Sequence, residues 1–264
     1  MNIIVCMKQV PNPDLQFQVA PSGTDIKRDT LNYRVNGFDE YALEEAVRLK
    51  ERLKGKVTVI TVGPKRTEQM LREALAKGAD EAVRASYEDP AALNSYQVAR
   101  ILAEAVKKIP HDLVLTGVQS DDYLYSQTGA MMAGFLGCPH VSVVTKVAVE
   151  GQDLRLHREL EGGDQEIVMT KLPALLTIQS GINQPRYAPL PAVMRAARAP
   201  IREIKPQDVG AQAWDQFVGG FQFKVRKVYL PAARGKAEMF TGKPADMVAK
   251  VAQLIKDKGF WRGG

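Results

Sequence analysis

The stretch Leu115–Gly137, LTGVQSDDYLYSQTGAMMAGFLG, contains the end of a strand, a polar loop and the start of a helix, in that order. The run 111–115 is typical of a buried strand, and the apolar and small residues of 127–136 fit a helix. In parallel α/β proteins, phosphates bind at such a turn because free backbone N–H groups and the positive end of the helix dipole meet there. The stretch therefore predicts a phosphate-binding turn at one edge of a parallel sheet.

The segments on the N-terminal side of this turn alternate between apolar strands and amphipathic helices. The predicted strands span residues 3–7, 57–62, 82–85 and 113–116. The predicted helices include residues 42–53, 67–77 and 93–108. Strands that alternate with helices of this length imply βαβ units and a parallel sheet, with right-handed crossovers that place helices on both faces. We therefore predict an α/β protein with a three-layer α/β/α fold and a mostly parallel sheet.

The pattern changes after Leu136, where strand-like segments follow one another with no helix between them. They span residues 141–149, 153–160, 165–170 and 174–178. We expect them to form an added antiparallel hairpin region, since the EGGD sequence of Glu161–Asp164 is typical of a hairpin turn. A second short hairpin is expected at 16–29, and prolines predict an irregular loop at 8–14.

The C-terminal sequence has too few periodic apolar residues to form a core of its own. Residues 206–242 show little periodicity, whereas 244–258 predict an amphipathic helix with one apolar stripe. A short helix is also expected at 191–198, between prolines. We predict two parts: a nucleotide-binding α/β domain at 1–205 and an extended C-terminal arm at 206–264 that packs on something else.

Composition narrows the class of protein. The chain has 264 residues, a net charge of +6 and two cysteines, Cys6 and Cys138, in apolar runs. No stretch approaches the roughly 20 apolar residues that cross a bilayer, and the N-terminus lacks the features of a signal peptide. Buried thiols suit a reducing compartment, so we expect a cytoplasmic protein with no direct membrane insertion. The basic residues do not form a nucleic-acid module, so no nucleic-acid partner is expected.

The residues that could bind a ligand lie in loops that follow the predicted strands. The loops 8–14, 62–66 and 117–129 share one sheet edge, and 36–39 precedes a helix that could join them. No dinucleotide fingerprint or Walker A loop is present, so ordinary βα turns with helix caps remain the alternative. Asp121 and Asp122 fit a capping role. The three histidines lack ligand spacing, so no metal site is expected, and no catalytic residues stand out. This pattern favours binding or electron transfer over bond-making chemistry.

Several motifs in order resemble the beta subunits of electron-transfer flavoproteins. The segment 36–46, NGFDEYALEEA, resembles the family's N-P-[FY]-D-x-x-A-[VL]-E-x-A pattern, and Lys8–Pro11 its first loop. Gly117 and Gln119, with Gln127–Gly129, resemble its phosphate loop. The most specific match is 158–166, RELEGGDQE, followed by Leu172-Pro173-Ala174, which resembles the family's signature hairpin.

The resemblance implies a fold of the adenine-nucleotide-binding type and a role in electron transfer. Such a subunit pairs with an alpha subunit that holds most of a redox-active FAD at the interface. The heterodimer carries electrons from acyl-CoA or related dehydrogenases to a membrane quinone oxidoreductase. The beta subunit itself holds an AMP with a structural role, and its C-terminal arm wraps the alpha subunit.

The resemblance also assigns residues to sites. The expected cofactor-binding residues are Cys6, Asn36, Gly37, Phe38, Asp39, Val62, Val118, Gln119, Ser120, Asp121, Asp122, Ser126, Gln127, Thr128 and Gly129. Phe38 corresponds to an aromatic residue whose ring approaches the flavin. Leu190 corresponds to the tip of the loop that docks on partner dehydrogenases. Arg186, Arg195 and Arg198 would form a charged rim around it.

The chain departs from the family pattern at two places. Gly37 stands where proline is usual, which predicts a looser turn, and residues 118–124 lack the basic residue and the second acidic position of many relatives. Some relatives carry a second FAD in place of AMP, accept electrons from NADH and bifurcate them, and this is the first alternative. A stand-alone nucleotide-binding regulatory domain is the second, and it predicts a folded monomer.

Overall fold

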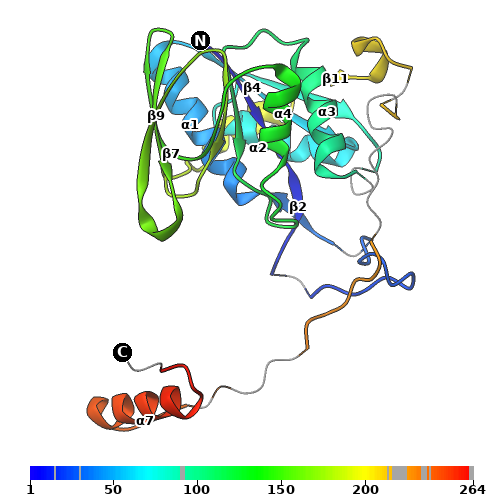
Figure 1. The fold of residues 1–264 in the computed structure, drawn as a ribbon. Coiled ribbons are helices and arrows are strands. Elements are labelled where there is room, and N and C mark those ends of the chain that lie inside the picture. The colour runs from blue at the N-terminus through cyan, green and yellow to red at the C-terminus, as the bar shows by residue number, and fades with distance from the viewer. Residues whose placement is uncertain are drawn as a thin grey trace.

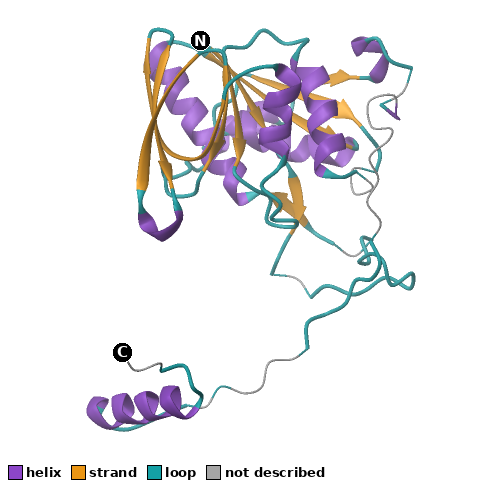
Figure 2. Cartoon of the chain, viewed as in Figure 1, coloured by secondary structure: helices purple, strands orange, loops and turns teal. Residues whose placement is uncertain are grey.

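A nine-stranded sheet forms the centre of the fold, and parallel strands make up most of it (Figures 1 and 2). The computed structural model describes residues 1–14, 16–29, 31–89, 93–212, 214–215, 225–232, 237 and 239–261. The strand order is β11-β5-β4-β1-β6-β10-β7-β8-β9. The parallel strands are β1 (Asn2–Cys6), β4 (Lys56–Gly63), β5 (Glu81–Ser86), β6 (Leu113–Gly117), β10 (Ala174–Ile178) and β11 (Arg202–Ile204).

Helices cover both faces of the sheet, as the alternation of strands and helices predicts. One face carries α1 (Gly37–Leu53) and α2 (Glu68–Ala76), and the other carries α3 (Ser95–Val106) and α4 (Thr128–Leu136). Successive residues of β1 show why: Ile3 and Val5 belong to the first core, whereas Ile4 and Cys6 belong to the second. Because neighbouring side chains of a strand point to opposite faces, an all-apolar strand needs cover on both sides. The predicted three-layer α/β/α fold is confirmed.

The added strands are antiparallel in three of the four expected cases. β7 (His140–Glu150), β8 (Asp153–Glu159) and β9 (Gln165–Lys171) form an antiparallel run at one side of the sheet. The prediction was wrong for β10, which lies between β6 and β7 and is parallel to both. All five of its residues are buried, so it lacks the alternation that marks a half-exposed antiparallel strand.

Short elements complete the edges of the fold. Within the loop expected at 8–14, β2 (Gln9–Pro11) pairs with β3 (Tyr33–Val35). Pro11 is tolerated at this strand end, where no ladder N–H is required. The hairpin expected at 16–29 is reduced to one bridge, between Val19 and Ile26. β11 was not predicted, because three residues are too short to show periodicity.

The predicted arm begins with residues that contact the α/β domain. Trp214 is buried in the second core, to which α3 also contributes, and its indole N–H donates to the backbone oxygen of Ser86 at 2.8 Å. The predicted amphipathic helix is present as α7 (Pro244–Asp257), drawn in red in Figure 1, and none of its residues is buried. The segments 216–224 and 233–236 of the arm lie outside the described residues. No helix in the described ranges has the length and apolar character needed to span a membrane.

Candidate nucleotide-binding site

A pocket opens at the carboxyl ends of β1, β4 and β6. In the strand order β4 and β6 flank β1, so the direction in which strands are added reverses beside β1. Ligands of open α/β sheets bind at such a switch point. The pocket is lined by residues at or just after the ends of the three strands, among them Lys8, Val62 and Val118, and by the first residues of α3 and α4. It includes about 1200 Å³ of empty space, part of which is open to solvent.

Most residues assigned to the cofactor site line this pocket. They are Cys6, Asn36, Asp39, Val62, Val118, Gln119, Ser120, Asp122, Ser126, Gln127, Thr128 and Gly129. Gly37, Phe38 and Asp121 lie beside it and do not line it. The fold therefore brings together four segments that are far apart in the sequence.

Asn36 joins the start of α1 to the loop at 117–129, the expected phosphate loop. Its side-chain amide donates to Gln119 O at 2.9 Å, and its Oδ1 accepts from the backbone N–H of Asp121 at 2.9 Å. The Asp121 carboxylate accepts from the N–H of Gly37 at 3.1 Å, so it caps α1 from a different part of the chain. Proline has no N–H and could not donate this bond. The turn expected to be loose is thus tied to the loop by a bond that glycine permits.

Asp39 links the ends of β1 and β6. Its carboxylate accepts from the N–H of Lys8 at 2.7 Å and from the N–H of Gly117 at 3.0 Å. Burial raises the pKa of Asp39 to about 7, although these hydrogen bonds act to lower it. A Cβ at position 117 would lie 2.5 Å from Asp39 Oδ1 and 2.6 Å from Phe38 Cβ, so only glycine fits there. Asp39 therefore sets the spacing between two of the loops that line the pocket.

Cationic side chains reach the pocket from outside the phosphate loop. Lys8 Nζ lies 2.6 Å from Asp122 Oδ1, 3.3 Å from Ser120 Oγ and 4.3 Å from the centre of the Tyr123 ring. Arg28 and Arg66 also line the pocket, and the Arg66 guanidinium lies over the Tyr33 ring at 4.7 Å. These three residues can supply the positive charge that residues 118–124 lack.

Sequence reasoning missed Arg28 and Tyr33 as pocket residues. Arg28 lies in the segment between β2 and β3, and Tyr33 is the first residue of β3; neither place contains a recognisable motif. Arg66 ends the loop 62–66, which was expected at this sheet edge because it follows a strand, although Arg66 was not named among the cofactor-binding residues.

The start of α4 is shaped to receive an anion. Its N-cap residue, Gln127, forms no side-chain cap hydrogen bond, and the first N–H groups of a helix have no partner within the helix. Ser126 has a left-handed backbone with φ of 52°, and its hydroxyl donates to Gln119 Oε1 at 3.2 Å. A Cβ at Gly129 would lie 2.5 Å from Thr177 Cγ2 and 2.9 Å from Thr116 Oγ1. Glycine at this position therefore lets α4 begin directly above β6 and β10.

The residues expected to dock a partner belong to a segment that contacts α1 and α2 and does not line the nucleotide pocket. Leu190 begins α5 (Leu190–Ala196) and its side chain is 72% exposed. Arg195 and Arg198 are exposed, whereas Arg186 is partly buried and paired with Glu44 and Glu51. Within the described ranges, no group of acidic residues, histidines and cysteines could hold a metal ion.

The fold and the pocket define an α/β protein with a ligand site at the switch point of its sheet. Residues 24–209 match the family model described as "Electron transfer flavoprotein domain". The electron transfer flavoprotein subunit beta of Methylophilus methylotrophus is 39% identical over 261 residues, which cover 97% of this chain and 98% of that protein.

Two further relatives carry the same description. The Homo sapiens subunit beta is 39% identical over 213 residues, covering 80% of this chain and 83% of its own length. The Bacillus subtilis (strain 168) subunit beta is 32% identical over 259 residues, covering 98% of both chains. The chain belongs to the electron transfer flavoprotein family and is related to its beta subunits.

Proposed function

We propose that this chain is the beta subunit of a FAD-containing heterodimer. With an alpha subunit it would carry electrons from acyl-CoA or related dehydrogenases to a quinone-linked oxidoreductase. The observation that supports the role most directly is the pocket at the sheet switch point, lined by the segments that the family resemblance assigns to a nucleotide.

The pocket would hold an AMP with a structural role. Its phosphate would meet the N–H groups at the start of α4, with Ser126, Gln127 and Thr128 as side-chain donors and Lys8 as the nearest cation. The apolar wall formed by Val62, Leu93, Val98 and Leu102 would take the base. Because the pocket joins the ends of three strands to the starts of α1, α3 and α4, a bound nucleotide would stabilise the whole sheet edge.

The FAD would supply the redox chemistry and would be held mainly by the alpha subunit. Phe38, in the first turn of α1, is the residue of this chain that would approach it. The amphipathic stripe of α7 has no partner among the described residues, and Val248 and Val251 are 68% and 41% exposed. An arm that wraps an alpha subunit would cover this stripe.

The nucleotide content of the purified heterodimer tests this proposal. The chain is produced together with its alpha subunit, the complex is denatured, and the released small molecules are quantified by chromatography and mass spectrometry. One FAD and one AMP per heterodimer supports the proposal. A purified chain that stays folded and monomeric without an alpha subunit would contradict it and favour a stand-alone nucleotide-binding domain.

A second FAD in the pocket is the alternative that one observation favours. The pocket extends past the phosphate loop to Arg28, Tyr33 and Arg66, with the stacked rings of Tyr123 and Tyr125 beside them. Such a site could take a dinucleotide. Two FAD molecules and no AMP per heterodimer would replace the AMP assignment with a bifurcating subunit that takes electrons from NADH.

A further inference from the structure

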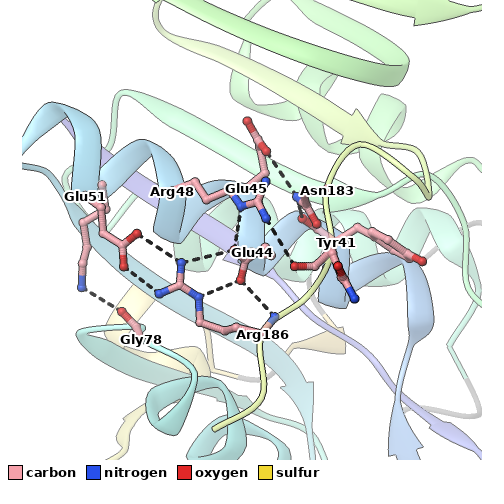
Figure 3. Close-up of polar contacts among 10 residues, drawn as sticks. Tyr41, Glu44, Glu45, Arg48, Glu51, Gly78, Asn183 and Arg186 are labelled. Carbon is pink, nitrogen blue, oxygen red and sulfur yellow. Dashed lines mark hydrogen bonds and ion pairs between the residues drawn. The ribbon is translucent and has the colours of Figure 1, made fainter. Parts of the chain in front are cut away.

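Arg186 precedes the exposed apolar segment Tyr187–Met194 and is held by two carboxylates of α1 (Figure 3). Its Nε donates to Glu44 Oε2 at 2.8 Å, and its Nη1 donates to Glu51 Oε1 at 2.6 Å. Its Nη2 donates to both residues, to Glu44 Oε1 at 3.2 Å and to Glu51 Oε2 at 3.1 Å. Every side-chain nitrogen is engaged within the chain, so little of the guanidinium is left for a partner's carboxylate.

Glu44 makes this contact an internal anchor rather than a surface ion pair. Its side chain is 5% exposed, and it also accepts from Arg48 Nε at 2.7 Å and from the backbone N–H of Arg186 at 3.2 Å. Removing one of the two cations that hold a buried carboxylate is costly, so the arrangement is strongly held. Glu51 differs, because its side chain is 53% exposed and remains accessible to substitution.

The segment that follows Arg186 is fixed on both sides. Before it, Asn183 Nδ2 donates to Tyr41 O at 3.0 Å and to Glu45 Oε2 at 3.2 Å (Figure 3). After it, Arg72 Nη1 of α2 donates to the backbone oxygens of Ala196 and Ala199 at 3.0 and 2.8 Å. The backbone of residues 187–195 is therefore held at both of its ends.

The side chains between these attachments face solvent. Tyr187, Leu190 and Met194 are 94%, 72% and 65% exposed. Apolar side chains on a backbone that is already fixed lose less entropy when they bind, which is the advantage of preorganisation.

We propose that Arg186 is a positioning residue that holds the Tyr187–Met194 segment in its docking orientation by bridging Glu44 and Glu51. This inference rests on the proposed function, and it removes Arg186 from the charged rim in which the sequence analysis placed it beside Arg195. The helix that carries both carboxylates begins at the nucleotide pocket with Gly37. The docking segment and the pocket are therefore attached to the same rigid element.

The Glu51→Gln variant distinguishes two possible roles of Arg186, direct attraction of a partner and positioning of the segment. The two roles predict opposite changes in docking affinity. If Arg186 attracted an acidic partner directly, Glu51→Gln would remove a competing negative charge and tighten docking. If Arg186 positions the segment, the same change loosens docking. The measurement is reduction of the heterodimer's FAD by an acyl-CoA dehydrogenase at increasing dehydrogenase concentration, which yields KM and kcat separately.

A positioning role for Arg186 predicts that substitutions of Glu51 and Arg186 change KM rather than kcat. Glu51→Gln should raise KM about threefold and Arg186→Gln about tenfold, with kcat within about twofold and flavin content unchanged. The double variant should be no weaker than Arg186→Gln, because both changes remove the same bridge. Arg195→Gln is the matched control, and its effect should add to that of Glu51→Gln. A lower KM for Glu51→Gln, or additivity between Glu51→Gln and Arg186→Gln, would overturn the inference.

Backbone hydrogen exchange in the free heterodimer provides a readout that does not depend on electron transfer. Amides of residues 187–194 should exchange faster in Glu51→Gln and Arg186→Gln than in the unaltered protein or in Arg195→Gln. Unchanged exchange in both variants overturns the positioning role. If no acyl-CoA dehydrogenase reduces the unaltered heterodimer, the proposed function fails, while the exchange experiment still decides whether Arg186 fixes the segment.

Discussion

The helices α3 and α4 begin at the same pocket but differ in how their first backbone N–H groups are capped. At α3, Asn94 Oδ1 accepts from the N–H of Gln97 at 3.0 Å, and Gln97 Oε1 accepts from the N–H of Asn94 at 2.9 Å, which is a capping box. At α4, the N-cap Gln127 makes no side-chain cap bond. α3 caps its own N-terminus, whereas α4 has no side-chain cap and under the proposed function would offer its first N–H groups to the nucleotide.

A third helix shows an intermediate arrangement. The first N–H of α1, that of Gly37, is bonded to Asp121, which belongs to the phosphate loop. This cap ties α1 to the loop that begins α4, so the conformation of the loop and the start of α1 depend on each other. The comparison therefore separates a helix that caps itself (α3), a helix capped by the loop before α4 (α1) and a helix without a side-chain cap (α4).

The largest expected effect concerns Asp39, in the first turn of α1. Its pKa is raised from 3.8 to about 7, so between pH 4 and 7 the folded chain keeps a proton that the unfolded chain loses. The free energy of unfolding therefore falls as pH rises through this window, by up to about 4 kcal/mol, and levels off above it. Denaturant unfolding at several pH values measures this loss.

Asp39→Asn is the control for this pH dependence. The asparagine has no carboxyl group to titrate, so the decline between pH 4 and 7 should become shallower. Parallel pH profiles for the two proteins would show that Asp39 ionises normally in the folded state.

The next effect distinguishes two glycines of α4. Gly129→Ala places a Cβ 2.5 Å from Thr177 Cγ2, so α4 must shift away from the sheet, at a cost of about 1–3 kcal/mol together with loss of bound nucleotide. Gly134→Ala meets nothing within 4 Å and should stabilise the helix by about 0.5–1 kcal/mol. Thermal unfolding and nucleotide content after purification measure both. Equal behaviour of the two variants would mean that close packing of α4 is not required.

The smallest effect compares the two caps directly. Asn94→Ala removes the capping box of α3 and should cost about 1 kcal/mol in the free energy of unfolding, with nucleotide content unchanged. Gln127→Ala removes no cap bond, so the ligand-free protein should change by less than about 0.5 kcal/mol. Stabilisation by added AMP is then measured for both proteins. A loss of AMP stabilisation in Asn94→Ala alone would reverse the roles assigned to α3 and α4.

The sequence predicted elements well where their pattern is local. The periodicities of α1, α2 and α3 and the apolar runs of β1, β4 and β6 follow from residues within each segment. The antiparallel placement of β10 was wrong because a buried five-residue run does not encode its neighbours. The partners of β10 depend on how the chain returns across the sheet after β9.

The site was less accessible to sequence reasoning where contacts span long distances along the chain. Arg186 and Glu44 are 142 residues apart, so nothing near Arg186 indicated that its charge is used internally. Arg28 reaches the pocket from an excursion without a motif. The phosphate loop was easier to locate, because a strand, a polar loop and a helix start are adjacent in the sequence.

The buried indole of Trp214 gives the protein a built-in optical probe. The chain contains two tryptophans, and the other, Trp261, is 60% exposed beyond α7, whereas Trp214 is 4% exposed. Emission from Trp214 should be blue-shifted and poorly quenched by iodide, and emission from Trp261 should be red-shifted and readily quenched. Fluorescence of the single-tryptophan variants Trp261→Phe and Trp214→Phe can therefore follow the two ends of the arm independently while a partner subunit is added.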